Sequence, residues 1–281
     1  MINMIQIGKF QTLKVLRISK IGAYLDAETG DDADNVLLPN NQLTEEMQVG
    51  DEVRVFIYRD SEDRLIATRK EPLIQVDEMA VLKVKETTKI GAFLDMGLER
   101  DVLLPFKEQK YKVNPGQKYL VGLYVDKTGR LTATTYVSRF LGTDSPYKKD
   151  DWVKGTVYSL NPELGALVAV DNKYKGLIPK SETSQEFKLA EEVECRVIRT
   201  REDGKLDLSL REVAYKQIDS DAEMILTKIE RYGGTLPLND KSSPEEIMDR
   251  LKISKASFKR AVGRLMKEGK VEQTEKGIKL K

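Results

Sequence analysis

Three stretches of the sequence repeat one another at intervals of about 70 residues. Each joins a Gly-Ala-hydrophobic segment to an apolar run that ends in proline. The repeated segments are Lys20–Asp26 (KIGAYLD), Lys89–Asp95 (KIGAFLD) and Leu164–Val168 (LGALV), with the following runs ending at Pro39, Pro105 and Pro179. This period is too long for a solenoid repeat and fits a small independent domain. The sequence therefore predicts an array of similar modules, which suits one extended partner contacted several times.

The composition argues against several classes of chemistry. The chain contains no histidine and a single cysteine, Cys195. Without histidine it lacks the usual general base and the usual metal ligand, and one cysteine excludes a cysteine-rich zinc site. The acidic run at 31–34 lacks the ligand spacing of a calcium loop and is interpreted as a solvated loop. We therefore expect a protein that is not an enzyme and that has no cofactor and no metal site.

Hydropathy and charge limit the choice of partners. No segment approaches the roughly 18 unbroken apolar residues of a membrane span, and the first residues do not resemble a signal peptide. We therefore expect a cytoplasmic protein with no membrane partner. The net charge of +1 is unevenly distributed, from −4 over residues 1–71 to +4 over residues 213–281. Any binding of nucleic acid must then use local patches and not overall positive charge.

Each repeat predicts about five short strands. The segment 52–58 alternates strictly, so that Val53 faces a core while Tyr58 points outward. Tyr124 has the same outward phase in the second unit, and Cys195 takes a core position in the third. Short strands without helical periodicity between them predict a small closed barrel. Pro72 and the Ser-Pro pair at 145–146 mark the joints, giving predicted domains 1–71, 72–145 and 146–212.

The tail, residues 213–281, has a different pattern. It predicts a helix over 222–232, a second helix capped by Ser243 and a third capped by Ser254. The apolar stripes of the second and third helices include Met248 and Met266, respectively. Residues 270–273 and 277–280 then predict a hairpin. Three helices followed by a two-stranded hairpin is the order of a winged helix.

The third unit resembles the S1 RNA-binding domain, an oligonucleotide-binding (OB) barrel. The resemblance rests on the segments 176–182 (GLIPKSE) and 206–211 (LDLSLR). The first two units keep the Gly-Ala-aromatic segment but lack the Ser-Glu stretch. Three S1-like units followed by a winged helix resemble the conserved virulence factor B family of bacterial RNA-binding regulators. The expected fold is mainly β with a small α+β tail: three tandem S1/OB-type five-stranded barrels and a C-terminal winged-helix domain.

The sequence departs from the S1 pattern at the expected stacking face. S1 domains often carry an aromatic residue where this chain has Ile21, Ile90 and Leu164, and proline replaces the family's face histidine. The third unit also has Leu167 where the first two have Tyr24 and Phe93.

Single-stranded nucleic acid requires aromatic faces for its bases and cations for its phosphates. The resemblance and the strand phase together predict RNA-binding residues in the barrels: Lys20, Tyr24, Tyr58, Arg64, Lys89, Phe93, Tyr124, Arg130, Tyr174, Lys175, Lys180 and Lys205. The winged helix is predicted to bind nucleic acid through one basic face: Lys255, Lys259, Arg260, Arg264, Lys267 and Lys270. The alternative interpretation is that the strand aromatics are core residues and that the basic helix face is only solvated.

Three functions fit these patterns. The first is a non-catalytic cytoplasmic protein that regulates expression by binding single-stranded RNA through several weak modules. The second is a transcription regulator that binds duplex DNA through the tail, although many such regulators are dimers and no dimerisation segment is evident. The third is a scaffold for protein partners, such as the ribosome. A nuclease is disfavoured because no catalytic domain remains once four modules are assigned.

Overall fold

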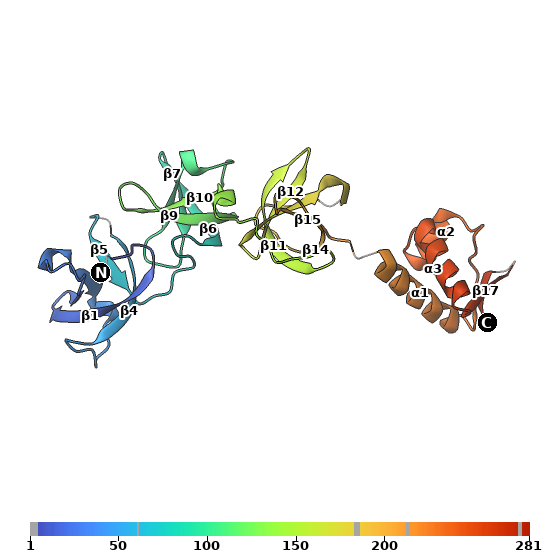
Figure 1. Cartoon of the computed structure of the whole chain (residues 1–281), viewed down its shortest axis with the longest axis horizontal. Coiled ribbons are helices and arrows are strands. Elements are labelled where there is room, and N and C mark those ends of the chain that lie inside the picture. Colours follow the sequence, from blue (N-terminus) through green and yellow to red (C-terminus); the bar gives the residue numbers. More distant parts are fainter. Residues whose placement is uncertain (1–4, 61, 183–185, 212–213, 275–276) are drawn as a thin grey trace. The chain divides into compact units, whose positions relative to one another are not determined.

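The structure is a computed structural model that describes residues 5–60, 62–182, 186–211, 214–274 and 277–281. The chain divides after Leu210 into two compact units. The first unit contains three closed five-stranded barrels and the second is a winged helix (Figure 1). The predicted fold class is confirmed. Among the described residues, no helix combines the length and apolar character needed to cross a membrane.

The three barrels share one strand order, in which the third and fifth strands pair in parallel. The first barrel consists of β1 (Phe10–Ser19), β2 (Gly22–Leu25), β3 (Val36–Pro39), β4 (Glu52–Arg59) and β5 (Leu65–Thr68). The second consists of β6 (Met79–Thr87), β7 (Gly91–Asp95), β8 (Val102–Pro105), β9 (Lys118–Val125) and β10 (Leu131–Thr134). The third consists of β11 (Trp152–Asn161), β12 (Gly165–Val170), β13 (Tyr174–Pro179), β14 (Glu192–Thr200) and β15 (Leu206–Ser209).

The repeated glycine has a steric cause. Gly22, Gly91 and Gly165 have φ angles of +152°, +151° and +121°, a region that side chains rarely adopt. A Cβ atom at these positions would lie 2.1–2.3 Å from a carbonyl oxygen of the neighbouring third strand. The residue before each glycine lies in the turn between the first and second strands and is exposed: Ile21, Ile90 and Leu164.

Both sides of β4 are buried at its end, because the second barrel packs against the first. Val55 and Ile57 face the first core, and Cys195 occupies the equivalent position in the third core as predicted. Phe56 and Tyr58, on the opposite side, join the apolar cluster of the second barrel. Tyr58 therefore points away from the first core, as its strand phase predicts, but the second barrel covers it: its residue is only 7% exposed and offers no open face to a base.

A second apolar contact joins the second and third barrels. Leu120 on β9 and Tyr158 on β11 belong to one buried cluster, against which the side chain of Leu167 packs. The hydroxyl of Tyr111 donates to the carbonyl oxygen of Tyr158 at 3.2 Å. Leu167 thus stands at the predicted stacking position but contributes to contact between barrels, because apolar neighbours partly cover it.

The winged helix contains α1 (Ala214–Arg231), β16 (Thr235–Leu236), α2 (Pro244–Leu251), α3 (Lys255–Lys267), β17 (Val271–Thr274) and β18 (Gly277–Leu280). The predicted caps are confirmed: Ser243 forms a capping box with Glu246, and the Ser254 side chain accepts from a backbone N–H in α3. Two features differ from the prediction: α1 begins at Ala214, before residue 222, and β16 adds a third strand to the hairpin. Met248 and Met266 are 48% and 44% exposed, so they are not core residues.

Candidate nucleic-acid interface

The first barrel has an open cleft beside the Tyr24 ring. The cleft has a volume of about 430 Å³, and Ile21, Tyr24, Leu37 and Ile66 form its apolar part. Its polar rim carries charges of both signs: Asp34, Asp60, Asp63, Arg59 and Arg64. Tyr24 is half-buried, whereas Ile21, at the tip before the repeated glycine, is 58% exposed. An apolar tip beside an aromatic face provides a surface that a flat base can contact.

A cation that the sequence analysis missed lies on the Tyr24 ring. The guanidinium carbon of Arg17 is 3.9 Å from the ring centroid, in cation–π geometry. A β-bulge between Val15 and Arg17 places Arg17 directly across from Tyr24. The bulge recurs in the other two barrels, but there Glu86 faces Phe93 and Ser159 faces Leu167. Because a planar guanidinium can itself stack on a base, Arg17 extends the aromatic surface and adds positive charge.

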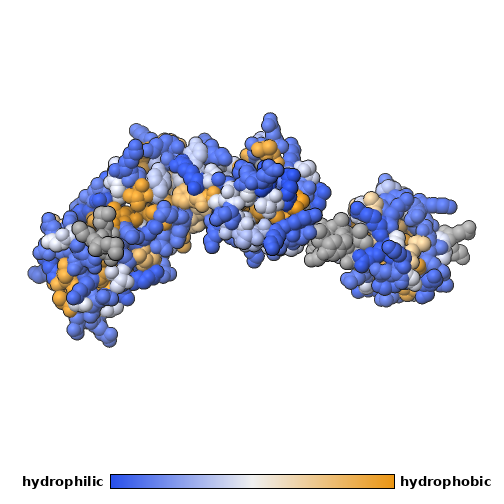
Figure 2. Space-filling view, viewed as in Figure 1, coloured by the Kyte–Doolittle hydropathy of each residue, from blue (hydrophilic) through white to orange (hydrophobic). Residues whose placement is uncertain are grey.

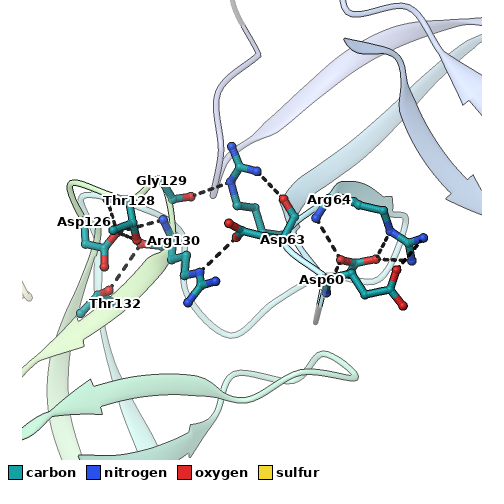
Figure 3. Close-up of polar contacts among 10 residues, drawn as sticks. Asp60, Asp63, Arg64, Asp126, Thr128, Gly129, Arg130 and Thr132 are labelled. Atoms are coloured by element: carbon teal, nitrogen blue, oxygen red, sulfur yellow. Dashed lines mark hydrogen bonds and ion pairs between the residues drawn. The ribbon is translucent and has the colours of Figure 1, made fainter. Parts of the chain in front are cut away.

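The turn after β4 neutralises one predicted cation. Arg64 contacts one carboxylate oxygen of Asp60 through Nε and Nη2 at 2.9 and 2.8 Å, and it also pairs with Glu62 at 2.9 Å (Figure 3). Burial would raise the pKa of Asp60, but the hydrogen bonds from Arg64 and the backbone outweigh it and lower that pKa. Arg64 is therefore held by two carboxylates. Lys20, by contrast, makes no ion pair with a described carboxylate.

A matching turn in the second barrel faces the first. Arg130 donates from Nε to a carboxylate oxygen of Asp63 at 3.1 Å, and Arg59 donates to the carbonyl oxygen of Gly129 at 3.2 Å (Figure 3). These contacts link the barrels across the cleft in which Tyr58 is buried. The structure therefore assigns Arg130 to contact between barrels, and its charge is already matched by a carboxylate.

The aromatic of the second barrel lies in acidic surroundings. Phe93 is half-buried and lines a cleft with Asp60, Glu86, Glu99 and Asp101. Arg59, Arg100 and Arg130 line an adjoining cleft that Phe93 also borders. On the side of Glu86 and Glu99, only Arg100 offsets the carboxylates. Phosphate is repelled by such a field at short range. Glu86 faces Phe93 where Arg17 faces Tyr24, so the second ring has weaker electrostatic support for a phosphate, even though Lys89 is exposed nearby.

Two further predicted aromatics are only partly accessible. Burial and the carboxylate of Glu108 raise the pKa of Tyr124 to about 12. Tyr174 packs against the third core and meets Tyr147 edge-to-face, with ring centroids 6.2 Å apart. Both rings are half-buried like Tyr24 and Phe93, but Tyr124 already contacts Glu108 and Tyr174 already contacts Tyr147.

The predicted cations of the third barrel are distributed unevenly. Lys205 pairs with Asp203 at 2.6 Å, and Lys180 donates to the carbonyl oxygen of Pro162 at 3.1 Å. Lys175 is half-buried and makes no ion pair with a described carboxylate.

The basic face of α3 is partly neutralised. Arg264 and Lys270 both pair with Glu268 at 2.8 Å, and Lys255 donates to the carbonyl oxygen of Ser242. Three cations are exposed and make no ion pair with a carboxylate in the described part of the chain: Lys259, Arg260 and Lys267. Polar residues dominate the visible surface of this unit in Figure 2.

Comparison with known proteins identifies the family. The chain is 34% identical over 292 residues to conserved virulence factor B of Staphylococcus aureus (strain N315), covering 96% of this chain and 95% of that protein. The chain belongs to the conserved virulence factor B family. It is also 37% identical over 276 residues to the protein YitL of Bacillus subtilis (strain 168), covering 95% and 91% of the two chains.

Individual modules match as well. Residues 7–70 and 78–136 match the S1 domain, 132–212 match the second domain of virulence regulatory factor CvfB, and 223–280 match the CvfB-like winged helix domain. A crystal structure described as a multidomain protein with nucleic acid binding domains from Streptococcus pneumoniae TIGR4 is 29% identical. It covers 98% of both chains with a TM-score of 0.51. The modules of the conserved virulence factor B family thus account for nearly the whole chain.

The structure brings together fewer of the predicted residues than the sequence suggested. Of the predicted residues, Tyr24 and Arg64 line one open cleft, and Arg17 contacts Tyr24 because the bulge fixes its register. Glu86 is visible in the sequence, but only the strand pairing shows that this carboxylate, and not a cation, faces Phe93.

Proposed function

We propose that this member of the conserved virulence factor B family is a nucleic-acid-binding regulator that binds single-stranded RNA in the cytoplasm and does not catalyse a reaction. The observation that carries the proposal is the Arg17–Tyr24 stack beside the open cleft of an S1 barrel. A base that enters this cleft meets an aromatic ring, a planar cation and the exposed Ile21 tip.

The proposal divides binding among the modules. Tyr24 and Phe93 supply stacking faces in the first two barrels, and the third barrel and winged helix supply exposed cations for the phosphates. Each module has a reduced face, because Tyr58 is buried, Arg64 and Arg130 are paired, and Leu167 packs between barrels. Affinity then depends on several modules binding one strand together.

The test is titration of the full-length protein with a fluorescent, unstructured RNA of about 25 nucleotides, a length chosen to exceed the roughly 4–16 nucleotides that one OB barrel contacts. Affinity is expected to fall with salt, with a log–log slope of about −0.7 for each neutralised phosphate. RNA recovered after incubation is expected to be intact. Absence of binding at low salt would refute the proposal, as would cleavage of the RNA.

Duplex DNA is a second candidate ligand, because α3 exposes Lys259, Arg260 and Lys267. The discriminating comparison uses two full-length variants, Tyr24→Ala and Lys259→Gln/Arg260→Gln, each titrated with RNA and with duplex DNA. RNA regulation predicts that Tyr24→Ala weakens RNA binding. A duplex-DNA regulator predicts tighter binding to the duplex, lost only in the α3 variant. If neither nucleic acid binds, a protein-binding scaffold becomes the better hypothesis.

A further inference from the structure

The third barrel carries an arrangement of charged groups that the repeat does not predict. Asp207 on β15 is 5% exposed and accepts hydrogen bonds from two arginines of β14 and the following turn. Arg199 contacts Oδ2 through Nε and Nη2 at 3.1 and 2.6 Å, and Arg201 contacts Oδ1 through Nε and Nη2 at 2.7 and 2.6 Å. One carboxylate therefore holds two guanidinium groups, which leaves a local excess of one positive charge.

A change of strand register produces this arrangement. In the first two barrels the fourth and fifth strands pair without a break, so that Tyr58 faces Ile66 and Tyr124 faces Thr132. In the third barrel a bulge between Val197 and Arg199 shifts the register and brings Arg199 across from Asp207. Bulges commonly redirect a side chain next to a functional site. The arginine stands where the other barrels place a tyrosine.

The two arginines are held but remain accessible. The Arg199 side chain is 67% exposed and the Arg201 side chain is 36% exposed, although their shared partner is buried. Arg199 contacts Oδ2 and Arg201 contacts Oδ1, so the two groups bind different oxygens of the same carboxylate. Burial would raise the pKa of Asp207, but the hydrogen bonds from Arg201 and Arg199 lower it, so the carboxylate stays charged.

We infer that Arg199 and Arg201, positioned by Asp207, form a site for a backbone phosphate of single-stranded nucleic acid. Guanidinium groups contact phosphate oxygens through paired N–H donors, and a group already fixed in position loses less side-chain entropy on binding. The contacts with Asp207 use Nε and Nη2 of each arginine, and within the described residues the Nη1 groups have no hydrogen-bond partner. This inference rests on the proposed function, since it names which cations of the third barrel contact the strand.

The experiment compares RNA binding by the full-length protein and by Arg199→Gln/Arg201→Gln across a range of salt concentrations. Removing the contacts to this one phosphate is expected to reduce the magnitude of the salt slope by about 0.7. The ratio of wild-type to variant affinity is then expected to fall about 2.6-fold between 50 and 200 mM salt. The matched control is Lys148→Gln/Lys149→Gln, which removes two exposed charges from the same module and is expected to change the slope less.

Two further variants separate the effect of positioning from that of charge, and they keep the proposal testable if the double glutamine variant does not fold. Arg199→Lys/Arg201→Lys keeps both charges and a partner for Asp207; it is expected to weaken binding with the slope nearly unchanged, because lysine lacks the fork. Asp207→Asn makes the protein more positive, so a pure charge effect would strengthen binding. Positioning by Asp207 predicts weaker binding instead.

The outcomes distinguish this inference from the proposed function. If the wild type binds no RNA, the proposed function fails. If the wild type binds and both arginine variants bind equally well with the same slope, only the phosphate site is refuted. A DNA strand of the same sequence is expected to show the same slope change, because phosphate contacts do not detect the 2′-hydroxyl. Displacement of RNA by millimolar inorganic phosphate at constant ionic strength would instead assign the site to free phosphate and overturn the inference.

Discussion

The substitution Tyr24→Ala tests the stacking site of the first barrel most directly. The ring is half-buried, lines the open cleft and contacts the guanidinium of Arg17. Stacking of one base contributes about 1–3 kcal/mol, which corresponds to a loss of affinity of about 5- to 150-fold. Tyr24→Phe keeps the ring and its contact with Arg17, so this control is expected to bind RNA like the wild type.

The comparison with Phe93→Ala sharpens the prediction. Phe93 occupies the equivalent position, but Glu86 faces it where Arg17 faces Tyr24. Its removal is therefore expected to weaken RNA binding less than Tyr24→Ala does. Fluorescence anisotropy with a labelled unstructured RNA at two salt concentrations measures both variants, and circular dichroism confirms that they fold. Equal binding by Tyr24→Ala and the wild type, or a larger loss in Phe93→Ala, would contradict the reasoning.

Three further predictions concern stability. Gly22→Ala is expected to destabilise the protein by about 2–4 kcal/mol, because its Cβ would collide with a carbonyl oxygen; Gly30→Ala, also at positive φ but with open space around it, should cost only about 1 kcal/mol in denaturant unfolding. Asp60→Asn is expected to lower the melting temperature at pH 7 by removing the partner of Arg64. The folded-state pKa of Asp60 lies below its ordinary value of 3.8, so its contribution to stability is present above that pH and is lost as the pH falls further. The melting temperatures of wild type and variant should therefore converge at low pH, and a constant difference would argue against this ion pair. Ser243→Ala should destabilise the winged helix by about 1 kcal/mol through loss of the capping box, measured as the melting of α-helical ellipticity.

The barrel fold was predictable because the repeat records local requirements of the backbone. The repeated glycine is needed wherever the first and second strands approach the third, and this requirement recurs in every barrel regardless of what the barrel binds. Alternation in β4 and β14 likewise located the core side, including the buried position of Cys195. These constraints act within one barrel, so a single sequence is enough to reveal them.

The outer faces were less predictable because their state depends on groups distant in the sequence. Tyr58 has the phase of a surface residue, yet the second barrel covers it. Arg130 is neutralised by Asp63, a partner 67 residues away. The pairing of Arg64 was easier to foresee, since Asp60 lies four residues before it within the same turn. Alternation gives the side of a strand on which a residue lies but not what packs against that side.

The three barrels share one backbone frame but present different side chains on their candidate binding faces. Placing Arg17, Glu86 and Ser159 across from the second-strand position changes its electrostatics while leaving the frame intact. A single stacked base with one or two cations gives weak binding, on the order of 100 µM if it supplies about 5.5 kcal/mol. Two such sites joined at an effective concentration of about 1 mM reach about 10 µM, provided that one strand can engage both. Differentiated faces on a common frame therefore allow one barrel to contribute stacking and another phosphate contacts, so that loss of either weakens binding without abolishing it.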